Sequence, residues 1–151
     1  MHPARVKTVL GTLDLLLPDG AELVPDPGVP DGEMLAWAPS PELGAFSVSH
    51  GPVAGRGAED LLALERGFAD AVEIERDDDE LVLRVVTHGA RDLVEGRGRV
   101  DEPTRRERVR FRFWESGGEA VRAGYRLDET APGDLRATFE RMADSLRLEA
   151  S

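Results

Sequence analysis

Apolar residues recur at helical spacing in two segments of the chain. The first segment has them at i, i+3, i+7 and i+11: Leu61, Leu64, Phe68 and Val72. The second has them at i, i+4, i+7, i+8 and i+11: Leu135, Phe139, Met142, Ala143 and Leu146. Because a helix buries such a stripe against a core, the pattern predicts one helix over residues 58–70 and a second that begins near Pro132.

The remaining segments show the two-residue alternation of strands, separated by turns rich in glycine and proline. Residues 5–17 are predicted to form one strand that bends at Gly11, whereas 25–32 and 89–104 are predicted to be loops. The other predicted strands are residues 33–38, 44–50, 72–75, 80–88, 105–115 and 119–128. Short turns between consecutive strands make them antiparallel.

The predicted order is three strands, a helix, four strands and a helix. This order indicates the α+β class, with an antiparallel meander-type sheet of about six to seven strands and two main helices packed on it. A chain of 151 residues has the length of one domain, so residues 1–151 are predicted to form a single α+β domain.

Composition and charge narrow the expected partners and location. With 30 acidic against 19 basic residues the net charge is −11, which repels nucleic acid. The chain has no cysteine, and this excludes disulfides and thiolate metal sites. No stretch approaches the ~20 apolar residues of a membrane span, and no signal peptide is expected, so we expect a cytoplasmic protein. The near absence of lysine suggests a GC-rich, hence bacterial, genome.

The predicted hairpin around Ser116, Gly117 and Gly118 alternates arginine with apolar residues. One side is predicted to face the core: Val109, Phe111, Phe113, Val121, Ala123, Tyr125 and Leu127. The other side holds arginines: Arg108, Arg110, Arg112, Arg122 and Arg126. This alternation places the aromatic residues inside and leaves an arginine-lined outer face.

Pairing across this hairpin brings like charges together. If the turn pairs Glu115 with Glu119, Arg112 lies opposite Arg122 and Arg108 opposite Arg126, and opposed like charges destabilise a sheet. Anions should therefore lie nearby. They could be acidic residues of the chain itself: Glu73, Glu75, Glu107, Glu115 and Glu119. The alternative is that they belong to an acidic partner or a phosphate, because the guanidinium group binds carboxylate and phosphate bidentately.

Other chemical motifs are weak. The acidic run from Asp77 to Glu80 lacks the spacing of a calcium-binding loop and is predicted to be a solvated turn. The histidines have no metal-ligand spacing: His2, His50 and His88. Ser47, Ser49 and His50 do not form a nucleophile elbow. We therefore expect no enzyme activity, no metal and no cofactor.

Two short motifs resemble the Mog1/PsbP-like family. The opening strand runs into Leu17-Pro18-Asp19-Gly20, and the last helix carries Phe139 through Leu146 with a Ser-Leu ending, where Met142 replaces an aliphatic residue. The aromatic residue that often follows the first turn in this family is missing. The resemblance implies a layered sandwich and a non-enzymatic binding module, since relatives include a small-GTPase nucleotide-release factor, photosystem subunits and chaperones for secretion effectors. It transfers no catalytic residue.

The main hypothesis is a non-enzymatic, cytoplasmic protein-binding or chaperone-like adaptor. Its arginine-lined face would bind an acidic protein or a second copy of the chain through six residues: Arg84, Arg108, Arg110, Arg112, Arg122 and Arg126. The alternative is a START-like small-ligand-binding domain with a cavity under the C-terminal helix. Five residues would line it: Trp37, Phe46, Phe111, Phe113 and Tyr125. A third hypothesis is an immunity-type inhibitor whose acidic surface covers a basic toxin.

Overall fold

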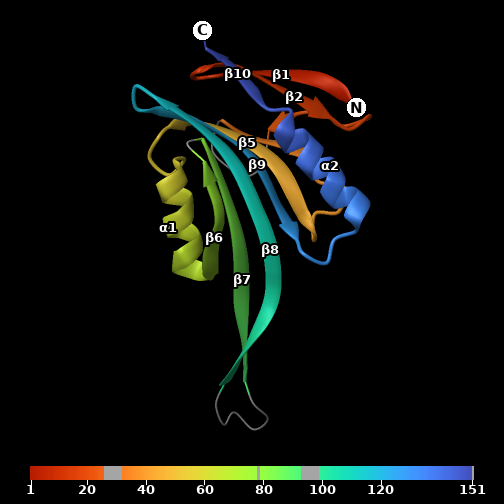
Figure 1. The fold of residues 1–151 in the computed structure, drawn as a ribbon, viewed down its shortest axis with the longest axis vertical. Coiled ribbons are helices and arrows are strands. Elements are labelled where there is room, and N and C mark those ends of the chain that lie inside the picture. Colours follow the sequence, from red (N-terminus) through yellow and green to blue (C-terminus); the bar gives the residue numbers. More distant parts are fainter. Residues whose placement is uncertain (26–31, 78, 93–98, 151) are drawn as a thin grey trace.

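A computed structural model describes residues 1–25, 32–77, 79–92 and 99–150 (Figure 1). In these residues the chain forms ten strands and two helices. The predicted α+β class, with an antiparallel sheet and two helices, is confirmed. Residues 26–31 of the predicted proline-rich loop lie outside the described residues, as do Asp78 and the side chains of Glu73 and Glu75.

The strands form two antiparallel sheets. Across the larger sheet the order is β3 (Val24–Pro25), β4 (Glu33–Trp37), β5 (Gly44–Pro52), β9 (Glu119–Asp128), β8 (Arg99–Ser116), β7 (Glu80–Asp92) and β6 (Asp70–Asp77). The smaller sheet consists of β1 (His2–Thr8), β2 (Gly11–Leu17) and β10 (Arg147–Ala150). Helix α1 (Ala58–Phe68) carries the chain from β5 to the far edge at β6, and the meander β6 to β9 returns to pair with β5.

The smaller sheet differs from the sequence prediction. Residues 5–17 do not form one strand, because the chain reverses at Val9 and Leu10 and pairs β1 with β2. The Thr8 hydroxyl stabilises this turn by donating to the Gly11 carbonyl at 2.7 Å and accepting from the Leu10 N–H at 3.2 Å. Strand β10 was not predicted, since four residues with alternating charge give too short a pattern to detect.

The predicted loop at 89–104 is also wrong over most of its length. Strand β7 continues to Asp92 and β8 begins at Arg99, so the hairpin extends past the other strands (Figure 1). Residues 93–98 lie outside the described part of the chain.

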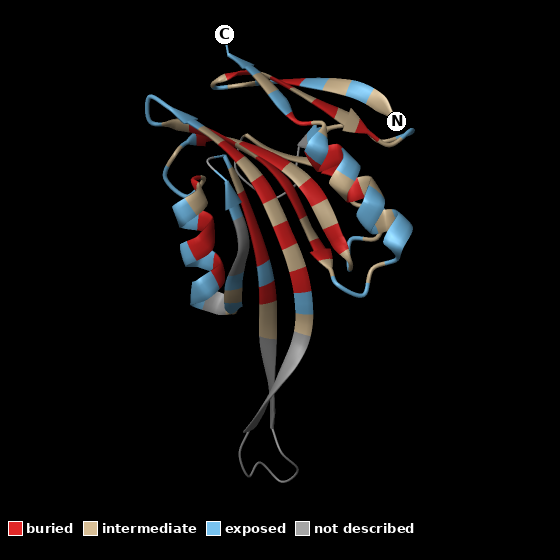
Figure 2. Ribbon diagram, viewed as in Figure 1, coloured by how far each residue is buried: buried red, intermediate tan, exposed pale blue. Residues whose placement is uncertain are grey.

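The two faces of the larger sheet hold separate cores, and one helix covers part of each (Figure 1). Helix α2 (Gly133–Asp144) packs on β8 and β9 and also on β2, whereas α1 packs on β6 and β7. We call these the α1 face and the α2 face. On the α2 face the apolar residues of β5 and β9 are buried, whereas the α1 face of these strands holds most of their half-buried residues (Figure 2).

Of the two predicted apolar stripes, one is confirmed and the other is partly wrong. The stripe of α2 is confirmed, since Phe139, Met142 and Ala143 are buried. The stripe of α1 is partly wrong, because Leu64 is 53% exposed while Leu62 is buried beside Leu61. The reason is Glu65, which occupies the inner face of the helix at 7% exposure and so replaces the expected apolar residue.

Neither of the two described helices has the length and apolar content that a helix needs to span a membrane.

Candidate functional site

The turn between β8 and β9 decides which face each arginine occupies. Gly117 and Gly118 have φ values of 59° and 82°, the left-handed conformation that a two-residue hairpin turn requires and that glycine adopts without strain. The turn pairs Ser116 with Glu119. The predicted pairing of Glu115 with Glu119 is therefore wrong by one residue, and a shift of one residue moves every side chain of a strand to the other face.

The arginines consequently lie on both faces of the sheet. Arg108, Arg110 and Arg112 share the α2 face with Tyr125, while Arg122 and Arg126 share the α1 face with the β8 apolar residues. The predicted opposition of Arg112 and Arg122 is wrong, because Arg112 faces Ala123. So is that of Arg108 and Arg126, because Arg108 faces Leu127.

One pair of arginines does face across strands, on the α2 face. Arg84 of β7 lies opposite Arg108 of β8. Each has its own carboxylate: Arg84 Nε lies 2.7 Å from Glu129 Oε1, and Arg108 Nε lies 3.2 Å from Glu140 Oε1. The anions that opposed arginines require are therefore supplied here by the chain itself.

Arg110 lies between the sheet and α2 and contacts three carboxylates. Its guanidinium nitrogens lie 3.0 Å from Glu80 Oε1, 2.5 Å from Glu140 Oε2 and 2.9 Å from Asp144 Oδ1. Burial alone would lower the pKa of Arg110, but the hydrogen bonds to Glu80 and Asp144 and the nearby negative charges raise it. Because Glu140 and Asp144 are one turn apart on α2, this single side chain fixes the helix to the sheet.

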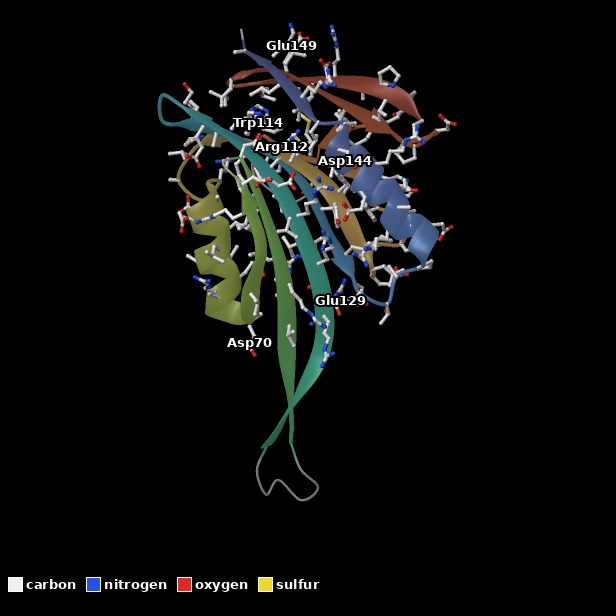
Figure 3. All side chains as sticks on the ribbon, viewed as in Figure 1. Asp70, Arg112, Trp114, Glu129, Asp144 and Glu149 are labelled. Carbon is white, nitrogen blue, oxygen red and sulfur yellow. The ribbon has the colours of Figure 1, made fainter. Side chains whose placement is uncertain are left out.

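Tyr125 and Arg112 complete the contacts under α2. The Tyr125 hydroxyl donates to Glu140 and accepts from Arg108 Nε at 3.1 Å, and burial, followed by the bond to Glu140, raises the pKa of Tyr125. Arg112 donates to the Leu146 carbonyl at 2.7 Å and lies 3.6 Å from Asp79. Figure 3 shows Arg112 and Asp144 at the end of the sheet near β10 and Glu129 toward its other end.

Arg126 connects α1 to β8 on the α1 face. It forms ion pairs with Glu65 of the helix and, at 3.2 Å, with Glu107 of β8. Burial lowers the pKa of Arg126, and burial also raises the pKa of Glu107, partly offset by Arg105 at 3.1 Å. Arg105 also lies 3.6 Å from Asp128, so two guanidinium groups and three carboxylates are close together at this position.

Arg122 is different from the other five arginines of the predicted surface. Within the part of the chain that the structure describes, it has no ion pair. Its guanidinium group lies over the Phe111 ring, 5.6 Å from the centroid, and donates one long hydrogen bond of 3.5 Å to the Gly55 carbonyl. Burial, and to a smaller extent the positive charge of Arg56, lowers the pKa of Arg122. Arg122 is thus a partly buried cation without a bound anion.

The two carboxylates whose charges raise the pKa of Arg122 are hydrogen-bonded to other groups. Glu33 accepts a hydrogen bond from Ser49 at 2.5 Å and from Arg56 at 3.5 Å. Asp60 accepts from the Gly57 N–H at the start of α1, at 3.2 Å. Both act on Arg122 only through their charge.

A groove of about 470 Å³ lies on the same face, where α1 does not cover the sheet. We call it the open groove, and its lining residues are Leu35, Pro41, Gly44, Ala45, Ser47, Arg105, Glu107, Phe111 and Arg126. Ser47 pairs with Gly124 on β9, so small residues form the middle of this surface. A Cβ at Gly124 would collide with the Arg110 carbonyl oxygen, which is why the closely packed backbone requires glycine there.

A second depression, of about 740 Å³, is acidic. It lies between the start of α1 and the end of β6, and its charged lining residues are Glu59, Asp60, Arg76, Asp77, Asp79, Glu80 and Glu115. Glu59 lies 2.5 Å from Arg76, and Glu80 pairs with Arg110. Among the described side chains, no three His, Asp or Glu residues are arranged to hold a metal ion.

The five residues predicted to line a cavity under α2 are divided between two cores. Trp37, Phe46 and Tyr125 pack around Phe139, with ring centroids 5.2, 6.4 and 5.4 Å from it. Phe111 and Phe113 lie in the core under α1, on the opposite face of the sheet. The five residues therefore do not line one cavity, because the larger sheet separates the two groups.

Ser49 and His50 also have structural partners. The Ser49 hydroxyl bonds Glu33 and Arg56, while His50 Nδ1 accepts the Val9 N–H at 3.3 Å and so connects β5 to the turn of the smaller sheet. Consecutive strand residues point to opposite faces, so these two side chains do not converge. Burial, and then the charge of Arg56, lowers the pKa of His50.

Of the carboxylates that pair with these arginines, Glu107, which pairs with Arg126, was identified from the sequence, whereas Glu65, Glu140 and Asp144 were missed. Glu140 and Asp144 are separated by four residues on the predicted second helix, a spacing that places both on one side of it. The burial of Glu65 could not be predicted, because a charged residue of a helix is ordinarily expected to face solvent. No known family model matches this chain, and no curated protein matches it significantly.

Proposed function

We propose that this protein is a non-enzymatic binding module of the adaptor or chaperone-like kind, and that its open groove receives an acidic segment of a partner protein. The observation that carries the proposal is Arg122, a partly buried guanidinium group without an ion pair among the described residues; it does not line the groove itself but lies over the ring of Phe111, which does. An approaching carboxylate would replace the hydration that Arg122 has lost and form a charge-assisted hydrogen bond.

The other arginines support this choice by elimination. Arg84, Arg108, Arg110, Arg112 and Arg126 each lie within 4 Å of at least one carboxylate of the chain. A partner would have to displace those carboxylates before it could bind them, and this costs more than binding a free cation. Of the surface predicted from the sequence, Arg122 is therefore the residue we propose as the partner contact.

The chemistry of the groove favours a protein segment over a nucleic acid. Leu35, Ala45 and Phe111 contribute apolar atoms to its lining, and the small side chain of Ser47 leaves space above the sheet. A net charge of −11 repels a polyphosphate chain, but it does not prevent one carboxylate from reaching one guanidinium group. The resemblance to the Mog1/PsbP-like family, whose members are binding modules, supports the same proposal, and we expect the partner in the cytoplasm.

Peptide display tests this proposal directly. A library of random dodecapeptides is selected on the wild-type protein and each enriched peptide is then measured against Ser47→Trp, which fills the groove, and Arg122→Gln. Ala137→Trp is the matched control, because Ala137 is exposed on α2. Circular dichroism checks that all variants are folded.

The expected result is enrichment of acidic peptides that lose at least about tenfold in affinity, roughly 1.4 kcal/mol, on Ser47→Trp and on Arg122→Gln but not on Ala137→Trp. Peptides that bind all variants equally would show that the groove is not the binding site. Enrichment of basic peptides would instead favour the acidic depression and the toxin-inhibitor hypothesis. Sedimentation of the free protein shows whether a second copy of the chain occupies the surface.

A further inference from the structure

A small pocket between α2 and the strands β7 and β8 is lined by three arginines. We propose that this pocket, which we call the arginine pocket, binds a phosphate group, either as free phosphate or as part of a small phosphate monoester. The proposal goes beyond the proposed function and is independent of it, because the arginine pocket lies on the α2 face and shares no residue with the open groove.

The size of the arginine pocket suits a small anion. Its volume is about 210 Å³, and its lining residues are Arg84, Arg108, Leu127, Asp128, Glu129 and Arg136. A pocket for a drug-sized ligand has about 300–1,000 Å³, whereas one water molecule occupies about 30 Å³ of liquid. The arginine pocket therefore has room for a phosphate group with several water molecules, but not for the whole of a large cofactor.

The three arginines come from three elements. Arg84 of β7 and Arg108 of β8 lie directly opposite each other, and like charges in this position destabilise a sheet unless anions lie near them. Arg136 is exposed near the start of α2, where the helix dipole disfavours a cation. Within the described part of the chain Arg136 has no ion pair. An anion in the pocket would therefore relieve unfavourable charge on both the sheet and the helix.

Only one carboxylate shares the pocket with these arginines among the described residues. Asp128 lines the pocket, but its carboxylate accepts two hydrogen bonds from Thr130 and lies 3.6 Å from Arg105. Glu129 lies 2.7 Å from Arg84. The lining therefore has three guanidinium groups and, at Arg84, a single carboxylate, which leaves positive charge for a ligand.

The two arginines of the sheet keep nitrogen atoms for a further anion. Arg84 uses Nε and Nη2 to bind Glu129. Arg108 uses Nε, which donates to Tyr125 and Glu140, and its terminal nitrogens donate to no described residue. A protein segment that took over Nε would have to displace Glu140, whereas a small oxyanion that approaches the terminal nitrogens does not.

Phosphate fits this arrangement better than a carboxylate does. The fork of a guanidinium group binds phosphate bidentately, and a phosphate group has enough oxygen atoms to contact more than one fork at once. Glu129 competes for Arg84, but both side chains of this pair are partly exposed, and exposed ion pairs are weak. Removal of the Glu129 charge should therefore strengthen phosphate binding.

Isothermal titration calorimetry tests the proposal at constant ionic strength and about pH 8, where a phosphate monoester carries two negative charges. The probes are inorganic phosphate, glycerol 3-phosphate and acetate, which has one negative charge. Each is titrated into the wild type, Arg136→Gln and Glu129→Gln. Arg141→Gln is the matched control, because it removes an exposed arginine from the last turn of the same helix. Thermal unfolding checks that all variants are folded.

We expect inorganic phosphate, glycerol 3-phosphate or both to bind with a Kd of about 5 mM or below, and acetate to bind at least about tenfold more weakly. Arg136→Gln should weaken phosphate binding at least about fivefold, and Glu129→Gln should strengthen it at least about twofold, whereas Arg141→Gln should leave it unchanged. Binding of inorganic phosphate would assign the pocket to free phosphate, and binding of the ester alone would assign it to a phosphorylated small molecule.

Four results would contradict the proposal. They are the absence of binding by either phosphate compound below about 5 mM, acetate binding as tight as phosphate binding, equal effects of Arg136→Gln and Arg141→Gln, and a failure of Glu129→Gln to strengthen binding. None of these results bears on Arg122 or the open groove, so the proposed function and the phosphate site can fail separately.

Discussion

The α2 face and the α1 face of the larger sheet are formed by the same central hairpin, yet their arginines have different surroundings. On the α2 face, Arg110 contacts three carboxylates, two of them from the helix that covers it. On the α1 face, α1 packs mainly on β6 and β7, and Arg122 lies over a phenylalanine ring and has no ion pair within the described residues. The strands are alike, and the position of each helix makes the difference.

This contrast separates two roles for the same residue type. An arginine whose charge is balanced by carboxylates of a covering helix contributes to stability. A partly buried arginine without an ion pair lowers the stability of the fold, and its presence calls for another explanation. Arg126 shows the boundary between the two roles, because it lies on the open side but reaches back to Glu65 of α1.

The largest expected effect is the loss of the core under α2. Phe139→Ala should lower the free energy of unfolding by about 3–5 kcal/mol, because it leaves a cavity among Trp37, Phe46 and Tyr125. Urea denaturation followed by circular dichroism measures it. A loss below about 1 kcal/mol would mean that α2 does not close this face.

A pair of leucines on α1 tests how that helix covers its own face. Leu62→Ala should cost about 2–3 kcal/mol because Leu62 is 5% exposed, whereas Leu64→Ala should cost less than about 0.5 kcal/mol because Leu64 is 53% exposed. Thermal unfolding of the two variants provides the comparison. A larger loss for Leu64→Ala than for Leu62→Ala would contradict this orientation and favour the stripe predicted from the sequence.

The two kinds of arginine can be compared with one substitution. Arg110→Gln should destabilise by about 2 kcal/mol, since it leaves Glu80, Glu140 and Asp144 without their shared cation. Arg122→Gln should change stability by less than about 0.5 kcal/mol, or increase it, because no ion pair is lost. Urea denaturation at neutral pH measures both, and a larger loss for Arg122 than for Arg110 would contradict the assignment of roles.

The smallest expected effect is the pH dependence of the contact between the sheets. Burial lowers the pKa of His50 from 6.5, and neutral Nδ1 accepts the Val9 N–H. The unfolded chain therefore binds a proton more readily, so this stabilisation is complete above pH 6.5 and is lost as the pH falls below it. His50→Gln should flatten the decline in melting temperature on acidification, and His2→Gln should not.

The sequence predicts the elements better than it predicts their faces. The stripe of α2 and the strands of the hairpin follow from periodicity alone, because consistently apolar positions lie against a core. The register of β8 and β9 does not follow, since it depends on whether the turn contains two residues or three, and Gly117-Gly118 permits both. This difference of one residue in the turn places Arg122 and Arg126 on the opposite face of the sheet from Arg110.

The candidate site could be predicted only in part. Arg122 was found because it belongs to an obvious alternation, but its lack of an ion pair depends on where Glu33 and Asp60 direct their carboxylates. The groove residues Leu35 and Ser47 gave no signal, because they become neighbours of Gly124 and Phe111 only when β9 inserts beside β5. Long-range strand order of this kind is not encoded in any local pattern.

The insertion of β9 between β5 and β8 has a consequence for the rate of folding. The meander β6 to β9 can form from neighbouring segments, but the pairing of Phe46 with Tyr125 must close a loop of almost eighty residues. Non-local pairings of this kind slow folding, because the entropy of loop closure is lost before the contacts form. The open groove lies across the paired strands β5 and β9, and it should therefore be among the last surfaces to form.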